Sequence, residues 1–128
     1  MANENKSLWP DFEANSIITP KAILLEQGKF LSEKTKNILE TDVRSSSLEN
    51  NVYLHFYIVA PNMNNYSFHL LTLIHDVQLY PSTIKSYHDK TPVEYSCKNQ
   101  KEVLSALKEI FNHSSSIKII QSLLAQSI

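Results

Sequence analysis

The chain has 128 residues and a single glycine, Gly28, where average usage of about 7% would supply about nine. Glycine allows a backbone to turn through left-handed conformations or to lie directly against a phosphate. Phosphate-binding loops, dinucleotide-binding fingerprints and nucleophile elbows all need such glycines at fixed places. The sequence therefore excludes ATPase, kinase-like, Rossmann and α/β-hydrolase proteins built on those motifs.

Length and composition indicate one folded unit. A single hydrophobic core typically occupies about 100 to 150 residues, so a second domain has no room. Hydrophobic residues make up 42% of the chain and charged residues 20%, a balance that buries a core and differs from that of disordered proteins. We expect residues 1–18 to form an irregular N-terminal arm that places an aromatic side chain on the core, and residues 19–128 to form one domain.

Residues 19–40 predict the first helix. Thr19 is a suitable N-cap, and Pro20 fits the first helical position, where its missing N–H costs nothing. Apolar residues then recur at helical spacing as far as Ile38 and Leu39. One side of this helix should face the core and the other should face water.

Gly28 falls inside this helix, where glycine costs about 0.5–1 kcal/mol relative to alanine. Two explanations are open. Either another segment approaches the helix too closely for a side chain, or the glycine is simply tolerated.

The middle of the chain has the composition of an antiparallel sheet. Its apolar runs are rich in β-branched and aromatic residues, and they are separated by Pro61, by Pro81 and by an asparagine-rich turn. These signals predict a meander of four or five strands. The expected strands cover residues 41–47, 51–60, 66–80, 82–88 and 92–97.

The last third of the chain returns to helical spacing. Asn99 and Glu102 match the logic of a capping box, and apolar residues then recur on one face up to residues 112–116, "NHSSS". Beyond that break the stripe resumes, so the segment forms two helices or one bent helix. The predicted fold is α+β, with an N-terminal helix, an antiparallel meander and two C-terminal helices packed on one sheet face. Because both strand faces of the central hairpin carry apolar residues, something else should cover the other face.

Three of the five histidines lie in the predicted central hairpin. Side chains alternate along a strand, so each strand presents two sets of residues. In the first strand, one face holds Tyr53, His55, Tyr57 and Val59. In the second strand, the more polar set is Ser67, His69, Leu71, Leu73 and His75.

A metal site in this hairpin would need His55 opposite His69, which would place their Cβ atoms about 5 Å apart. His75 lies six residues further along the strand, or about 20 Å, and cannot join the same site. Two ligands do not make a zinc site, because zinc takes three or four protein ligands. We therefore predict no metal and no cofactor, and we interpret the histidines as amphipathic cover on a half-exposed face.

Nucleophilic catalysis has candidate residues but no motif. Cys97 precedes a predicted helix, whose N-terminus would lower the thiol pKa, although a small structural cysteine is the simpler interpretation. Serine, histidine and carboxylate residues are present without the local signature that marks a catalytic triad. We expect a protein that is not an enzyme.

Charge and targeting signals indicate which classes of partner and which cellular compartment to expect. The net charge is -1 and Arg44 is the only arginine, so the chain lacks the basic stripe that nucleic-acid binding requires. The N-terminus has no apolar signal region, the single cysteine cannot form an internal disulfide, and no apolar run approaches the roughly 20 residues of a membrane span. We expect a cytoplasmic protein that binds neither nucleic acid nor membrane.

The function that fits these exclusions is that of a non-catalytic interaction module, which binds a protein partner or a second copy of itself. Tyrosine is enriched at protein interfaces, and the candidate binding residues lie on a face or edge of the predicted sheet. These residues are Tyr53, His55, Tyr57, Tyr66 and His69.

Two alternatives remain open. One is a small-ligand-binding protein or enzyme with a pocket near His55, His69 and Cys97. The other is an inhibitor or immunity-type protein, which rests only on the small size of the chain and its lack of catalytic motifs.

Overall fold

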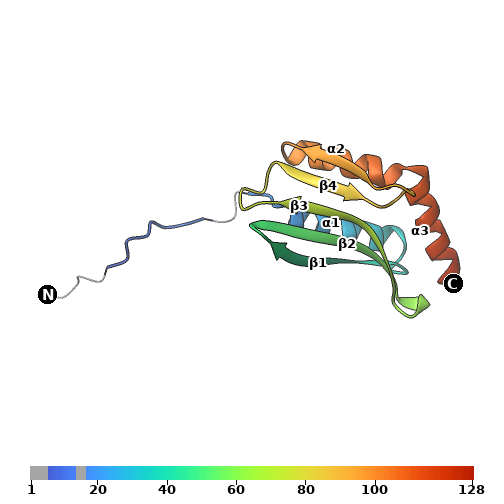
Figure 1. Cartoon of the computed structure of the whole chain (residues 1–128). Coiled ribbons are helices and arrows are strands. Elements are labelled where there is room, and N and C mark those ends of the chain that lie inside the picture. The colour runs from blue at the N-terminus through green and yellow to red at the C-terminus, as the bar shows by residue number, and fades with distance from the viewer. Residues whose placement is uncertain (1–5, 14–16) are drawn as a thin grey trace.

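The computed structural model describes residues 6–13 and 17–128 and has the predicted α+β architecture. Five antiparallel strands form one sheet in the order β1-β2-β3-β4-β5. One helix precedes the sheet and two follow it (Figure 1). The elements are α1 (Pro20–Lys34), β1 (Glu40–Leu48), β2 (Asn51–Ala60), the short 3-10 helix η1 (Pro61–Met63), β3 (Tyr66–His75), β4 (Ser82–Ser86), β5 (Val93–Cys97), α2 (Gln100–Asn112) and α3 (Ser114–Gln126).

Helix α1 begins as predicted, with the Thr19 hydroxyl accepting a hydrogen bond from the Ala22 N–H. It ends at Lys34, however, so the predicted end at residue 40 is wrong. The reason is Thr35, whose hydroxyl donates to the Leu31 carbonyl and accepts from the Leu39 N–H, closing a turn in place of another helical one.

Gly28 marks the closest approach of α1 to the sheet. A Cβ placed at Gly28 would overlap the Oγ1 atom of Thr41 on β1 and would lie 3.1 Å from the Thr41 Cβ. Of the two explanations for this glycine, close packing is therefore correct.

The hairpin of β2 and β3 contains a β-bulge. Phe56 pairs with Leu71 and the next residue, Tyr57, pairs with His69, which leaves Leu70 without a partner in the register. Leu70 and Leu71 are both buried. A bulge of this kind turns two successive side chains toward the same side of a sheet.

The bulge reverses the alternation in the second half of β3. His69 lies before it and faces away from the helices, as its pairing with Tyr57 requires. Leu73 and His75 follow it, are buried and lie on the helical side. The prediction that His69 and His75 share a face is therefore wrong, because it carried a strict period of two through the bulge.

Strand β3 ends at His75 rather than at the predicted Tyr80. Asp76 causes the break, because its carboxylate accepts a hydrogen bond from the Gln78 N–H and closes a local turn. Leu79, with φ 73°, then takes the left-handed conformation.

Asparagines make most of the tight turns. Four of them adopt positive φ, where other chains often use glycine. The predicted turn between β2 and β3 is formed in this way by Asn64 and Asn65. The non-glycine residues with positive φ are Lys36, Asn37, Glu49, Asn50, Asn64, Asn65 and Leu79.

The C-terminal segment forms two separate helices, which resolves the alternative left open by the sequence. The Asn99 side chain accepts from the Glu102 N–H, as predicted, while the Glu102 carboxylate accepts from the Lys98 N–H. His113 both ends α2 and caps α3, because its Nδ1 atom accepts a hydrogen bond from the Ser115 N–H.

The helices cover one face of the sheet. Helix α1 packs on β1 while α2 packs on β4 and β5, and the buried apolar residues lie between these layers. Figure 1 shows no described helix on the opposite side, which we call the outer face. No helix among the described residues is long and apolar enough to cross a bilayer.

The arm has no regular structure in residues 6–13. Trp9 and Phe12 are exposed and lie near each other, so neither packs on the core as expected. The remainder of the predicted arm includes residues 1–5 and 14–16, which lie outside the described residues.

Candidate protein-binding face

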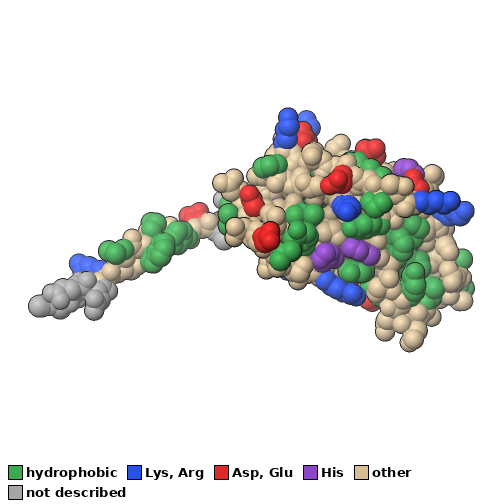
Figure 2. Space-filling view, viewed as in Figure 1, with side chains coloured by type: hydrophobic (Ala, Val, Ile, Leu, Met, Phe, Trp, Pro, Cys, Tyr) green, Lys and Arg blue, Asp and Glu red, His purple; other side chains and the backbone are tan. Residues whose placement is uncertain are grey.

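The outer face carries a row of aromatic and histidine side chains that the strand register brings together. Tyr57 stacks on His69 with ring centroids 4.7 Å apart, and His69 also lies 4.8 Å from Tyr87. His55 lies 5.4 Å from His69, and Tyr53 stacks on His55 at 6.3 Å. Figure 2 shows histidine side chains in the middle of this face with hydrophobic side chains around them.

Arg44 closes one end of this row. Its guanidinium carbon lies 4.1 Å from the centre of the Tyr57 ring, and its Nε atom bonds to the Asp42 carboxylate at 2.8 Å. The hydrogen bond to Asp42 is also the main reason that the pKa of Arg44 is raised. Arg44 is thus held over the Tyr57 ring by its contact with Asp42.

Hydrogen bonds hold both histidines in place. The Thr72 hydroxyl lies 3.0 Å from His55 Nδ1 and 2.8 Å from His69 Nε2, while Ser46 Oγ lies 3.2 Å from His55 Nε2. A hydroxyl has one proton, so with neutral rings Thr72 donates to one imidazole and accepts from the other. The pair is therefore orientated by residues of two strands, Thr72 of β3 and Ser46 of β1.

Two histidines have a lowered pKa in the folded chain. For His69 the first cause is burial and the second is the neighbouring His55. For His88, on the other side of the sheet, the causes are burial and His113, whose ring centroid lies 4.6 Å away. Both sites therefore favour neutral imidazole.

Acid should destabilise the protein for this reason. Free histidine has a pKa of about 6.5, so below that value the unfolded chain binds protons that folded His69 and His88 resist. The contribution of these two histidines to the free energy of unfolding is complete above their pKa in the unfolded chain. It is lost as the pH falls through their lower pKa in the folded chain. We expect the free energy of unfolding, measured in urea by circular dichroism, to fall between pH 7.5 and pH 5.5.

The variant His69→Gln should show a smaller fall over the same pH range. Ser67→Gln, on the same strand, changes no titrating group and should keep the full fall. Equal pH dependence in both variants would show that His69 does not contribute.

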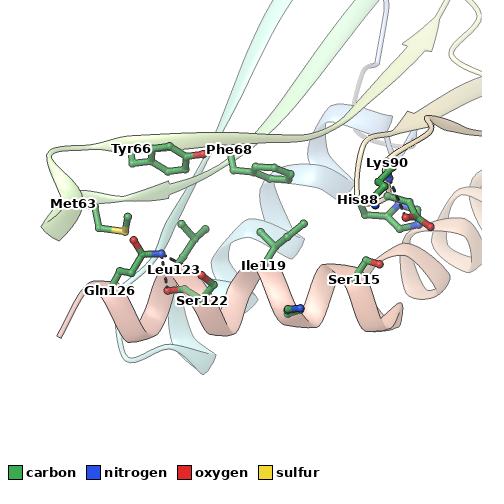
Figure 3. Close-up of a pocket in the computed structure, with 12 residues that line it drawn as sticks. Met63, Tyr66, Phe68, His88, Lys90, Ser115, Ile119, Ser122, Leu123 and Gln126 are labelled. Carbon is green, nitrogen blue, oxygen red and sulfur yellow. Dashed lines mark hydrogen bonds between the residues drawn. The ribbon is translucent and has the colours of Figure 1, made fainter.

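Tyr66 does not join the other predicted binding residues. It pairs with Ala60, which is buried on the helical side, and it lines a groove between β3 and α3. We call this the α3 groove. It has a volume of about 610 Å³, and Figure 3 shows Tyr66 and Phe68 facing Ile119 and Leu123 across it.

Cys97 is also separate from the histidine pair. It is buried on the helical side, and its Sγ atom donates to the Glu102 carbonyl at 3.6 Å. Burial, and then the charge of Glu102, raise the pKa of the thiol. Burial and the raised pKa fit the simpler interpretation, a small structural cysteine, rather than a thiol activated by the helix N-terminus. No described pocket joins Cys97 to His55 and His69.

A cavity of about 310 Å³ does lie between the sheet and the helices, but other residues line it. Its floor is formed by Phe56, Ile58 and the bulge residue Leu70, with Leu31 and Phe111 as walls. Among the described residues, no group of three or more histidine, cysteine, aspartate or glutamate side chains is placed to hold a metal ion.

The sequence reasoning missed three residues of the aromatic row and its supports, namely Arg44, Thr72 and Tyr87. Arg44 reaches Tyr57 from the neighbouring strand β1, and Tyr87 reaches His69 from just beyond the end of β4. Thr72 shares β3 with His69 and lies on the outer face beside it only because of the bulge. The register between strands is therefore needed to reveal these contacts. Comparison with known protein families, with curated proteins and with solved structures finds no match to this chain.

Proposed function

We propose that this protein is a small cytoplasmic, non-catalytic interaction module that binds another protein, or a second copy of itself, through the outer face. The observation that carries the proposal is the row of stacked rings formed by Tyr53, His55, Tyr57, His69 and Tyr87 on a sheet face that no described helix covers.

The row is already ordered before any partner binds. Stacking and the Thr72 hydrogen bonds restrict the rotamers of His55 and His69. An interface pays about 0.5–1.5 kcal/mol for each flexible side chain that it immobilises. Side chains that are held in advance avoid most of that cost, which favours a binding role for this surface.

The charges of the outer face favour a protein partner over a nucleic acid. Arg44 is paired with Asp42 at 2.8 Å, and Lys85 lies opposite Glu94 in the register of β4 and β5. Each cation therefore has a neighbouring acid. Little net positive charge remains to attract phosphates.

The outer face also has a suitable size. Strands β1 to β5 contain 9, 10, 10, 5 and 5 residues. At about 3.3 Å per residue and a strand spacing of about 4.8 Å, the face covers roughly 600 Å². A standard interface buries about 800 Å² on each partner. The outer face thus supplies most of one side of such an interface.

The substitution Tyr57→Glu should weaken association at least about tenfold, since it replaces a central ring with a charge that the partner would have to desolvate. The fold should tolerate it, because the Arg44 guanidinium is close enough to pair with the new carboxylate. Leu104→Glu is the matched control, because Leu104 is exposed on α2.

The unaltered protein and both variants, Tyr57→Glu and Leu104→Glu, are each measured in two ways. Sedimentation velocity over a range of concentrations detects self-association, and capture from host lysate detects a foreign partner. The proposal predicts an association that survives Leu104→Glu and is lost with Tyr57→Glu. An association unaffected by Tyr57→Glu and by His55→Glu would place the interface elsewhere.

A further inference from the structure

The arm of residues 6–13 has large apolar side chains without cover. Leu8 is 96% exposed, Trp9 77% and Phe12 73%. The two aromatic rings lie 6.2 Å apart, and Figure 1 shows the arm leading away from the domain. Clusters of exposed apolar residues usually mark a segment that binds another surface.

The α3 groove is a surface of matching character on the domain. Met63, Phe68, Ile119 and Leu123 form its apolar part, with Tyr66 at its edge. In Figure 3 the side chains of the β2–β3 hairpin and of α3 face each other across an open channel. Its volume of about 610 Å³ falls in the range of about 300–1,000 Å³ that is typical of ligand sites.

The charges of the two surfaces are complementary. Lys90 and Lys118 line the groove together with one acid, Asp89, which leaves a positive balance. In the arm, Asp11 and Glu13 flank Phe12. An arm lying in the groove would therefore place its aromatic rings on the apolar part and its acids near the lysines.

An arm of the same chain could bring Phe12 to the edge of this groove only in a fully extended conformation, which favours the arm of a second copy. The Tyr80 hydroxyl donates to the Ile18 carbonyl at 3.1 Å, which fixes the base of the arm beyond the His75 end of β3. From His75 to Phe68 the strand runs seven residues, or about 23 Å. Phe12 is six residues from Ile18 and reaches at most about 21 Å in a fully extended chain.

We propose that the arm of one copy binds in the α3 groove of a second copy, with Trp9 and Phe12 against its apolar part. Asp11 and Glu13 then lie near Lys90 and Lys118. This contact uses a surface other than the outer face, so it extends the proposed function to a second and independent interaction site.

The single tryptophan gives a direct test in the full chain. The emission of Trp9 should shift to shorter wavelength as protein concentration rises, in step with the increase in sedimentation coefficient. Trp9→Ala, followed by sedimentation alone, should weaken self-association at least about tenfold, since Trp residues at interface centres dominate binding. A blue-shifted emission that is independent of concentration, or no shift at all, would overturn the proposal.

Exchanging the charges of the arm and the α3 groove tests how the arm is orientated in the groove. Asp11→Lys and Lys118→Glu should each weaken self-association by up to about fivefold, in line with exposed ion pairs, and the double variant should recover most of the loss. Lys29→Glu, on the exposed side of α1, is the control and should have no effect. Failure of the double variant to recover any binding would contradict the contact.

The proposed arm contact and the proposed interaction through the outer face can be tested separately. Self-association that is lost with Ile119→Lys and kept with Tyr57→Glu supports the arm in the groove. The opposite result overturns the arm contact and leaves the outer-face proposal standing.

Discussion

Deleting Leu70 should leave the protein folded, whereas deleting Leu73, three residues further along β3, should abolish cooperative folding. Leu70 is the unpaired residue of the bulge, so its removal joins His69 directly to Leu71 and restores a regular alternation. Every other side chain of the strand keeps its face. The cost is one buried leucine, or about 2–5 kcal/mol.

Removing Leu73 has no such compensation. To keep the pairing of the residues that follow, Thr72 must move into the core and Leu71 must move to the outer face. Two leucines are then lost from the core, and a threonine hydroxyl is buried without a partner. The total of roughly 4–10 kcal/mol matches the whole stability of a typical domain.

Urea titrations followed by far-ultraviolet circular dichroism distinguish the two deletions. This signal is preferable to tryptophan emission, because Trp9 lies in the exposed arm and reports little on the core. The Leu70 deletion should show a cooperative transition at lower urea, and the Leu73 deletion should show none. Comparable stability of the two variants would mean that the bulge is not where the structure places it.

The second large effect is expected at Gly28. Replacing it with alanine should destabilise the protein by about 1–3 kcal/mol, because the new methyl group collides with the Thr41 side chain. Thr41 cannot simply rotate away, since its Cβ atom would itself lie 3.1 Å from the new methyl carbon. Separation of α1 from β1 must absorb the collision.

The same substitution should cost much less when Thr41 is alanine. Without Oγ1 only the short Cβ contact remains, and the higher helix propensity of alanine, worth about 0.5–1 kcal/mol, offsets part of its cost. A double-mutant cycle in urea measures the coupling. Lys29→Ala, on the neighbouring exposed position, should change stability by less than about 0.5 kcal/mol. A purely additive cycle would rule out the contact.

The sequence predicted those parts of the fold that depend on local chemistry. The Thr19 and Asn99 caps, the Pro61 stop and the asparagine turn act within a few residues of themselves, and each is found where expected. The helix end at Lys34 was missed because apolar spacing continued past it, while one threonine side chain closed the turn.

The candidate site depends on contacts between strands, and these were predictable only in part. Tyr53, His55 and Tyr57 share the outer face because alternation holds along β2. His69 joins them through the register, whereas Tyr66 and Cys97 lie on the helical side. No pattern in a single sequence marks a bulge made of two adjacent leucines in an apolar run, so the faces beyond Leu70 could not be assigned.

The near absence of glycine also affects the unfolded chain. Glycine has the largest conformational freedom of any residue, and replacing it at a compatible site stabilises a protein by about 0.4–1 kcal/mol through the unfolded state alone. This chain instead places asparagine, lysine, glutamate and leucine at its left-handed turns and accepts some strain in the native backbone. In exchange its unfolded ensemble is stiffer, and ordering the turns costs less entropy when the chain folds.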